Sequence, residues 1–448
     1  MLYRFRNKNI RNYNSQREKR NHDRFCNAPF TALRFHRNGW VQVCCHHIDF
    51  QFLKDKSLKE IWFSNELVNM RKSMKQFRIP ESCSFCAAPF YDGNFSNVIA
   101  RSFDHLESNS NAYPVLMDFS LENTCNLACI MCDASLSSTI QKARMVEHSK
   151  EKYIYDDEFI KQLDEFIPYL KHAVFTGGEP FLINAYYRIW NRFIEINPEI
   201  IINITTNGTV FNERIESLLK KGRFNITVSI DSLVPETYSA IRKGADLNIT
   251  MQNIHRFAEI CEIRGTVFTI TVCPMIINMR DIPQIVETCN LQGWYFNFNT
   301  VLKPWKQALW SLDDSSLSEL IACYKSIEFT QTNTDQANKN ISFFTSLIAL
   351  LENWQVRMRE RIRTLVSPQE ISALRMQIIE LLRKKLTVGL SENDHKITQV
   401  AMGIPDVLVN PRFLNYLNSM SDKMIINEFR ENDAETISDH FCIIAFNL

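Results

Sequence analysis

The sequence has no excess of either charge, since 51 Lys and Arg residues face 50 Asp and Glu residues, which gives a formal net charge of +1. A chain without a broad field of one sign does not attract nucleic acid or a membrane surface over long range. It also lacks an apolar run of membrane-spanning length, and its amino terminus has no apolar segment of the secretory kind. These absences predict a cytoplasmic protein with no membrane partner and no nucleic acid partner.

Disulfides are also not expected. The 13 cysteines of the chain suit a reducing compartment better than a disulfide framework, given that several of them stand at metal-ligand spacings. Apolar residues make up 45% of the 448 residues, which is ordinary for a globular protein. A chain of this length holds two or three domains with sizeable cores.

Three of the cysteines, Cys125, Cys129 and Cys132, lie within eight residues and have no fourth cysteine or histidine nearby. A structural zinc site is closed by four protein ligands, whereas three thiolates leave one metal position open. An iron-sulfur cubane held by three cysteines has one such iron, and a compact loop can wrap three of its corners. The alternative is that three small apolar thiols fill a core.

The spacing Cys-x3-Cys-x2-Cys resembles the signature of the radical S-adenosylmethionine (SAM) superfamily. The resemblance implies that the open iron of a 4Fe-4S cluster binds SAM, and that reduction of the cluster releases a 5′-deoxyadenosyl radical. Met131 stands where the family usually has an aromatic or other bulky residue against the adenine. A flexible, polarizable methionine side chain can fill that role.

A Gly-Gly turn, Gly177 and Gly178, follows the apolar run 173–175 and precedes Glu179 and Pro180. Glycine lets the backbone approach a ligand closely, and a carboxylate accepts hydrogen bonds from an ammonium group. The run resembles the Gly-Gly-Glu-Pro motif of the family, which implies that it holds the amino group of SAM. Alone, the pattern is also typical of an ordinary strand-to-helix turn.

Polar residues also stand where two later predicted strands end. The resemblance implies that Ser229 contacts the ribose of SAM and that Asn207 is a supporting polar group. Asp231, at the end of the same strand as Ser229, is predicted to belong to the cofactor site. Arg242 occupies the place of an arginine that binds the carboxylate of SAM with its fixed fork of donors. An exposed helix arginine is the alternative.

Strand-like and helical runs alternate along residues 113–305. Strands are predicted at 115–120, 173–176, 201–206, 224–231, 267–275 and 295–301, with helices at 157–170, 213–221 and 282–291. This alternation predicts parallel strands with crossover helices, and the ligand of such a sheet binds at the carboxyl ends of the strands. The predicted fold class is α/β, a partial (β/α)6 TIM-like barrel, and the resemblance implies the same fold.

Four further cysteines precede this barrel, namely Cys26, Cys44, Cys83 and Cys86. A turn glycine, Gly39, predicts a hairpin that brings the first two thiols together. Four thiolates close a second metal site, and both iron-sulfur clusters and zinc accept tetrahedral sulfur.

Residues 25–100 resemble the accessory domain called twitch, or half of the larger SPASM domain. The resemblance implies one auxiliary 4Fe-4S cluster, here placed before the barrel instead of after it. A zinc knuckle with the same thiolates is the alternative, and Cys45, His46 or His47 is a substitute ligand in either case. Residues 57–71 of this domain show helical periodicity.

The two ends of the chain are less informative. Residues 1–24 are basic. Such a segment can bind an acidic peptide or a phosphate-bearing substrate, but a solvated, partly disordered tail is the favoured interpretation. Residues 306–448 are predicted to be mainly helical, with amphipathic helices at 341–365 and 370–386. A cap on the barrel, a dimerisation element and a partner-binding module all suit such helices.

These patterns predict an enzyme, a radical SAM oxidoreductase or maturase that abstracts a hydrogen from its substrate while the auxiliary cluster transfers electrons. Oxidative modification or maturation of a peptide is favoured, because SPASM-like domains commonly accompany it. The alternatives are a dehydrogenase or epimerase of a small metabolite or sugar, with Cys273 as a hydrogen donor, and a non-catalytic iron-sulfur or zinc-stabilised binding protein. The resemblance implies an external electron donor such as flavodoxin or ferredoxin.

Overall fold

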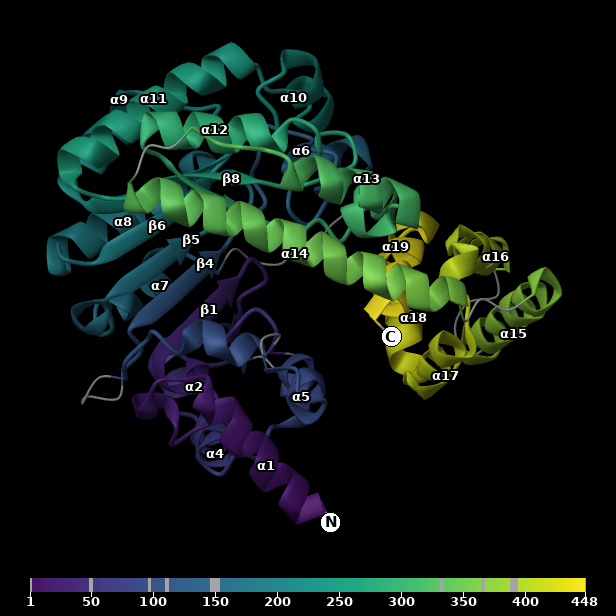
Figure 1. The fold of residues 1–448 in the computed structure, drawn as a ribbon. Helices are drawn as coiled ribbons and strands as arrows, with labels where there is room; N and C mark the ends of the chain where they lie inside the picture. Colours follow the sequence, from purple (N-terminus) through teal and green to yellow (C-terminus); the bar gives the residue numbers. More distant parts are fainter. Residues whose placement is uncertain are drawn as a thin grey trace. The chain divides into compact units, whose positions relative to one another are not determined.

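The structure is a computed structural model that describes residues 2–47, 51–95, 98–108, 113–145, 154–330, 334–363, 367–386 and 394–447. The chain divides into two compact units (Figure 1). The first contains Met1–Ser229 and Lys243–Thr269, and the second contains Ile230–Arg242 and Ile270–Leu448.

The first unit is built on a sheet of parallel strands with a hairpin at its edge. Its strands are β1 (Ala32–His36), β2 (Trp40–Gln42), β3 (Gln51–Phe52), β4 (Leu116–Ser120), β5 (His172–Phe175), β6 (Ile201–Thr206) and β7 (Arg223–Ser229). They lie in the order β3-β2-β1-β4-β5-β6-β7. Strand β2 pairs antiparallel with β1 and with β3, while β1, β4, β5, β6 and β7 pair parallel, so the amino-terminal segment extends the barrel sheet by three strands.

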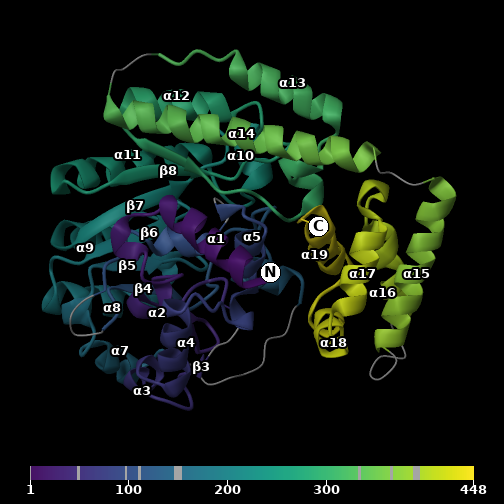
Figure 2. The same ribbon diagram turned by 60° about the horizontal axis from the view of Figure 1, so that its bottom comes forward.

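The helices of the first unit cover this sheet and its hairpin (Figures 1 and 2). They are α1 (Leu2–Ser15), α2 (Ala28–Thr31), α3 (Leu58–Trp62), α4 (Asn65–Lys75), α5 (Ser84–Tyr91), α6 (Ser138–Ala143), α7 (Asp157–Leu163), α8 (Asn184–Ile196), α9 (Glu213–Lys221) and α11 (Leu247–Arg264). The ring of Trp190 on α8 packs edge-on against Phe175 of β5 and Phe224 of β7, with centroids 5.3 and 6.1 Å apart. This apolar layer fixes the strands whose ends carry the predicted site.

The predicted strands agree with β4 to β7 within two residues at each end, and the predicted helix at 213–221 is α9. The helix predicted at 157–170 is shorter, because α7 ends at Leu163 and a 3-10 turn containing Pro168 follows it. The helical run predicted at 57–71 is two helices, because Ser64 caps a new helix, α4, through its side chain.

The prediction of a disordered basic tail is wrong for residues 2–15, which form α1 and pack on α5. The side chain of Tyr13 has no exposed surface, and its hydroxyl donates to the carbonyl of Phe25 over 3.1 Å. Its ring meets the edge of Phe90 with centroids 5.5 Å apart. Arg17 then pairs with Asp104 over 2.6 Å. One buried aromatic side chain and one ion pair therefore anchor a segment whose composition suggested solvation.

The second unit holds the remaining elements. They are β8 (Phe268–Val272, whose first two residues belong to the first unit), β9 (Tyr295–Phe298), α10 (Pro235–Ile241), α12 (Ile282–Gln292), α13 (Asp314–Lys325), α14 (Asp335–Arg363), α15 (Pro368–Leu386), α16 (Asp394–Gly403), α17 (Pro411–Ser419), α18 (Asp422–Glu431) and α19 (Ala434–Asn447). The long helix α14 packs on β9, α12 and α13, and α15 to α19 gather into a helical bundle (Figures 1 and 2).

The carboxy-terminal helices follow the predicted pattern. Helix α14 begins six residues before the predicted start at 341, and its predicted end at 365 lies outside the described residues. Helix α15 begins at Pro368, directly after Ser367. No helix in the described ranges is long and apolar enough to cross a membrane.

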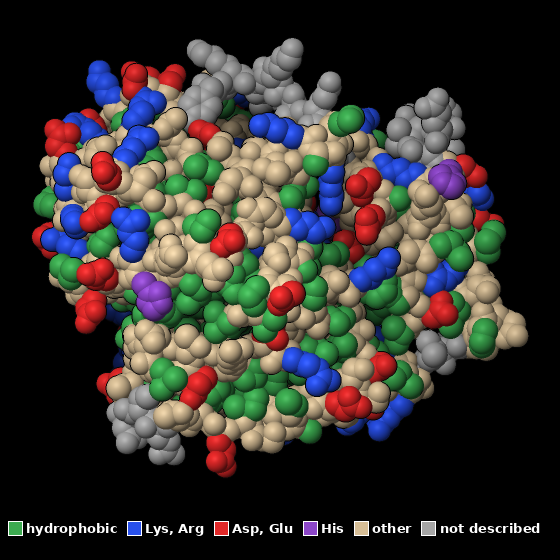
Figure 3. All heavy atoms as spheres, turned by 90° about the horizontal axis from the view of Figure 1, so that it is seen from above, with side chains coloured by type: hydrophobic (Ala, Val, Ile, Leu, Met, Phe, Trp, Pro, Cys, Tyr) green, Lys and Arg blue, Asp and Glu red, His purple; other side chains and the backbone are tan. Residues whose placement is uncertain are grey.

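The fold class predicted from the sequence is confirmed, since a parallel sheet forms the core and a mainly helical region follows it. Charged side chains of both signs are interspersed on the face shown in Figure 3, as the balanced composition predicts.

Candidate cofactor and metal sites

The loop of the three cysteines begins directly after β4 and is held by the start of α6. The backbone N–H of Cys125 donates to the Ser138 hydroxyl over 3.1 Å, and the Thr139 hydroxyl donates to the carbonyl of Cys125 over 2.7 Å. The hydroxyl of Ser137, the residue before α6, donates to the carbonyl of Leu127 over 2.6 Å. These bonds fix the loop backbone independently of any metal.

The Gly-Gly turn packs directly against the residues that lead into this loop. Gly177 and Gly178 have φ angles of +81° and +47°, a backbone conformation that side-chain-bearing residues rarely adopt. A Cβ atom on Gly178 would lie 2.2 Å from the carbonyl oxygen of Thr124, and the N–H of Glu179 donates to that same oxygen over 2.7 Å. The structure therefore brings together the two motifs that the sequence places about 50 residues apart.

The carboxylate of Glu179 joins these motifs to the end of β6. It has no exposed surface, and it accepts hydrogen bonds from the Thr206 hydroxyl and the Asn207 N–H, each over 2.7 Å, and from the Phe181 N–H over 3.1 Å. Through these three hydrogen bonds Glu179 fixes the relative positions of two strand ends.

Asn207 connects the end of β6 to the cysteine loop. Its side-chain amide donates to the Asn126 side chain over 3.0 Å and lies 3.9 Å from the sulfur of Cys125. Met131 and Ser229 are both partly exposed, on the loop and at the last residue of β7. Pro180 is buried at the start of a 3-10 turn and shapes the backbone without offering a polar group.

Asp231, Arg242 and Cys273 lie in the second unit, where they form a group of their own. Arg242 Nε lies 2.8 Å from Asp231 Oδ2, and the backbone N–H of Cys273 donates to Asp231 Oδ1 over 2.7 Å. Burial raises the pKa of Asp231, and the Arg242 guanidinium opposes that rise. Because Asp231 has no exposed surface, its effect on a ligand would pass through the arginine that it holds.

The four amino-terminal cysteines line one small cavity, whose lining residues include Cys26, Cys44, Cys83 and Cys86. Its other walls are apolar. Burial raises the pKa of the Cys26 thiol well above its usual value, and the neighbouring Cys44, Cys86 and Cys83 raise it further. Convergence of four thiols in an apolar pocket matches the donor set of an iron-sulfur cluster.

The substitute ligands proposed for this site lie elsewhere. Cys45 is exposed, and neither it nor His46 lines the four-cysteine cavity. His47 lines a different and larger cavity. Among the described residues, no three His, Cys, Asp or Glu side chains form a ligand set for a single metal ion.

Sequence reasoning missed the polar residues that support the cysteine loop, namely Ser137, Ser138 and Thr139. They form a hydroxyl-rich run that directly follows the loop and opens a helix, which is the usual pattern of a helix cap. Thr206, which donates to Glu179, gave no signal beyond its place at a strand end.

Comparison with known proteins agrees with this geometry. The family model described as the radical SAM superfamily matches residues 120–289, and the SPASM model, described as an iron-sulfur cluster-binding domain, matches residues 26–87. Residues 120–289 of the chain thus resemble the radical SAM superfamily. The predicted family is confirmed, and with it SAM and 4Fe-4S clusters as the cofactors that its two matched domains imply.

Two curated relatives match parts of the chain. The probable GTP 3′,8-cyclase of Methanocaldococcus jannaschii is 26% identical over 204 residues, which cover 41% of this chain and 63% of that protein. The GTP 3′,8-cyclase of Limosilactobacillus fermentum is 28% identical over 136 residues, which cover 30% of this chain and 39% of that protein. The chain thus spans less than two thirds of the length of these relatives.

Two solved structures are also similar. Streptococcus suis SuiB has a TM-score of 0.35 and 13% sequence identity, with 65% of this chain and 67% of that chain covered. Native anSMEcpe with bound AdoMet has a TM-score of 0.36 and 20% identity, with 46% of this chain and 58% of that chain covered.

Proposed function

We propose that this radical SAM protein is an enzyme that abstracts a hydrogen from a peptide, with its SAM-binding cluster on Cys125, Cys129 and Cys132. The observation that carries the proposal is the contact of the Gly-Gly turn with the cysteine loop, where Gly178 meets the Thr124 carbonyl. When bound, the cluster and SAM supply a one-electron reductive cleavage that gives a 5′-deoxyadenosyl radical. A protein that only stored electrons would have no need of this second motif beside its cysteines.

The other residues proposed to bind SAM have distinct roles. The backbone of Gly177 and Gly178 receives the amino group of SAM, and Ser229 contacts its ribose. Arg242 binds the carboxylate, and Asp231 is a positioning residue because it holds the guanidinium through Nε. Other residues contribute packing and support, namely Met131, Glu179, Pro180 and Asn207.

An auxiliary 4Fe-4S cluster on Cys26, Cys44, Cys83 and Cys86 is the second part of the proposal. The shared cavity of these thiols supports it. Such a cluster would accept an electron from the oxidised substrate and pass it on, and an external donor such as flavodoxin or ferredoxin would reduce the first cluster.

The first test measures 5′-deoxyadenosine released from SAM under dithionite, together with iron and sulfide, in anaerobically reconstituted protein. The triple variant Cys125→Ala/Cys129→Ala/Cys132→Ala is expected to lose all 5′-deoxyadenosine and to keep the iron of one cluster. Cys323→Ala, which removes an exposed thiol, is the matched control and keeps wild-type values. A triple variant that still released 5′-deoxyadenosine would refute the proposal.

The auxiliary site has its own matched pair of variants in two adjacent residues. Cys44→Ala is expected to lower iron by one cluster per chain, because Cys44 lines the four-cysteine cavity. Cys45→Ala is expected to leave the iron content unchanged, because that thiol is exposed and lies outside the cavity. Zinc at one equivalent in place of iron would instead establish the zinc knuckle.

A peptide is the proposed substrate because a SPASM-type domain matches residues 26–87, and such domains commonly accompany peptide modification.

The second candidate is a small metabolite or sugar that is oxidised or epimerised. It is favoured by the curated relatives, which are named for a small molecule, GTP. Epimerisation needs a hydrogen donor, and the partly exposed Cys273 is the candidate. Full turnover by Cys273→Ala would remove that role.

A further inference from the structure

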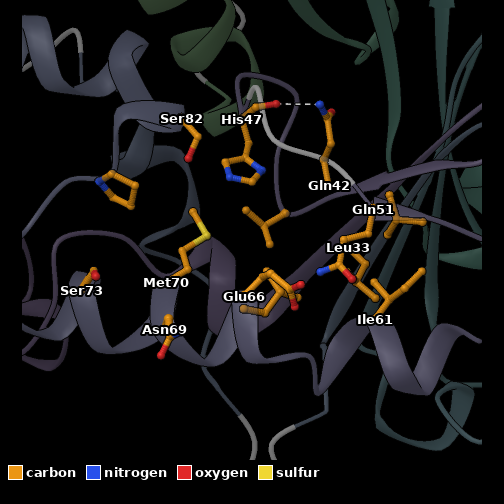
Figure 4. Close-up of a pocket in the computed structure, with 14 residues that line it drawn as sticks. Leu33, Gln42, His47, Gln51, Ile61, Glu66, Asn69, Met70, Ser73 and Ser82 are labelled. Atoms are coloured by element: carbon orange, nitrogen blue, oxygen red, sulfur yellow. Dashed lines mark hydrogen bonds between the residues drawn. The ribbon is translucent and has the colours of Figure 1, made fainter. Parts of the chain in front are cut away.

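A second cavity, of about 610 Å³, lies in the amino-terminal part of the first unit, between the β1–β2 hairpin and helix α4 (Figure 4). None of the residues proposed to bind SAM and none of the seven cysteines proposed to hold a cluster lines it. Ligand pockets of folded proteins commonly measure about 300–1,000 Å³, so this space is large enough for a ligand of side-chain or drug size.

The inner walls of the cavity are aliphatic. Leu33 and Val41 come from the hairpin strands, and Ile61, Leu67 and Met70 come from α3 and α4. Each of these side chains is at most 8% exposed. In Figure 4 the sulfur end of Met70 points into the space, opposite the imidazole of His47. An apolar group that entered here would therefore be surrounded by apolar atoms.

The rim of the cavity is polar but carries no cation among its lining residues. It presents amide and hydroxyl groups from Asn69, Ser73 and Ser82. Ser82 is only 6% exposed, and its side chain faces the cavity. The lining carboxylate, Glu66, lies 3.6 Å from the ammonium group of Lys56.

This lining selects among classes of ligand. A phosphate or carboxylate would find no guanidinium or ammonium group in the lining, and its burial without a partner would be costly. An apolar side chain flanked by backbone amides matches both the aliphatic walls and the amide and hydroxyl groups of the rim. Peptide chemistry therefore suits the cavity better than nucleotide or lipid-phosphate chemistry.

The cavity also adjoins the four-cysteine site. Val43 and Met70 line both spaces, so one layer of side chains separates them. We infer that this cavity anchors an aliphatic side chain of a peptide beside the auxiliary cluster, an inference that rests on the proposed peptide substrate and auxiliary site. The anchor would hold the peptide at a fixed distance from that cluster and would select sequences with an aliphatic residue at one position.

The test uses ligand-observed NMR on the reconstituted full-length protein, with N-acetyl-L-leucinamide as the probe and N-acetyl-L-aspartate 1-amide as its anionic counterpart. Ligands of this size reach affinities of about millimolar. The leucine probe is expected to bind saturably and at least tenfold more tightly than the aspartate probe. Absence of saturable binding, or equal binding of the two probes, would overturn the inference.

Matched variants on one helix locate the binding. Ser73→Trp places a large ring at the rim and is expected to weaken leucinamide binding at least fivefold. Lys72→Trp adds the same ring at the neighbouring exposed position outside the cavity and is expected to change nothing. Asn69→Trp, at an exposed lining position, replaces Ser73→Trp should that variant not fold. Unchanged binding in the rim variant that folds would refute the location.

A second readout tests the proximity of the two sites without any enzyme turnover. In the triple variant Cys125→Ala/Cys129→Ala/Cys132→Ala the auxiliary cluster is the expected source of the EPR signal. Saturating leucinamide is expected to shift that signal, and an unshifted signal would refute the shared wall of Val43 and Met70. Absence of iron in this variant would overturn the auxiliary-cluster proposal, whereas absence of leucinamide binding would overturn the cavity inference alone.

Discussion

Replacing Gly178 by alanine is expected to lower the release of 5′-deoxyadenosine about a hundredfold. The new Cβ atom would lie 2.2 Å from the Thr124 carbonyl oxygen, whereas ordinary contacts are about 3.5 Å or longer, so the turn must move by roughly 1 Å. A shift of that size in a reacting geometry costs about 10²-fold in rate, which corresponds to about 2.7 kcal/mol of barrier. The hydrogen bond from Glu179 to the same oxygen would be disturbed as well.

Gly265→Ala is the control that separates this clash from backbone strain. Gly265 also has a positive φ, +62°, but a Cβ atom there has no neighbour within 4 Å. Both variants carry the left-handed penalty of about 1–2 kcal/mol, and only Gly178→Ala also disturbs the site. The assay is the initial rate of 5′-deoxyadenosine formation under dithionite, with iron content and thermal unfolding measured in parallel. A wild-type rate in Gly178→Ala, or an equal loss in Gly265→Ala, would contradict the argument.

Four further variants test the supporting residues. Glu179→Gln places an amide N–H₂ group against the N–H and O–H groups that now donate to the carboxylate. The free energy of unfolding in urea should therefore fall by about 1–3 kcal/mol, and SAM should bind more weakly. An unchanged free energy of unfolding would count against the buried network. Arg242→Lys loses the forked donors of the guanidinium, and Asp231→Asn leaves that guanidinium without its anion. Both variants should raise the KM for SAM about tenfold, and only Asp231→Asn should also lower the free energy of unfolding, by about 3 kcal/mol. A KM equal to wild type in both variants would exclude binding of the SAM carboxylate by Arg242. Tyr13→Ala should lower the free energy of unfolding by about 3–5 kcal/mol, because the Tyr13 ring on α1 is fully buried. A change near zero would mean that α1 is not docked in solution.

The barrel was predictable because its pattern is local. Strands such as β6 alternate buried and partly exposed residues along their length, and Gly, Pro and Asn mark the turns that follow them. The cysteine trio and the Gly-Gly turn were predictable because their chemistry needs fixed residue types at fixed spacing. Their mutual contact followed from the rule that ligands bind at the carboxyl ends of parallel strands.

Features that depend on distant contacts were not predictable. The hydrogen bonds of Glu179 are one example, because its donors, Thr206 and Asn207, lie at the end of another strand and sequence distance does not show that they meet. Helix α1 looked like a solvated tail because of its basic residues, yet its Tyr13 is buried against Phe90. The pairing of β1 with β4 had no local signal at all.

The pairing of β1 with β4 decides which truncations of this chain leave the sheet intact. Five residues of β1 lie in parallel register with five residues of β4, from Ala32 opposite Leu116 to His36 opposite Ser120. A truncated chain that began after residue 100 would leave the backbone N–H and C=O groups along one side of β4 without partners, at the strand that leads into the cysteine loop. Exposed edges of this kind pair with other chains and aggregate. The amino-terminal strand β1 thus also protects the edge of the barrel sheet, and we expect the two parts to express only as one piece.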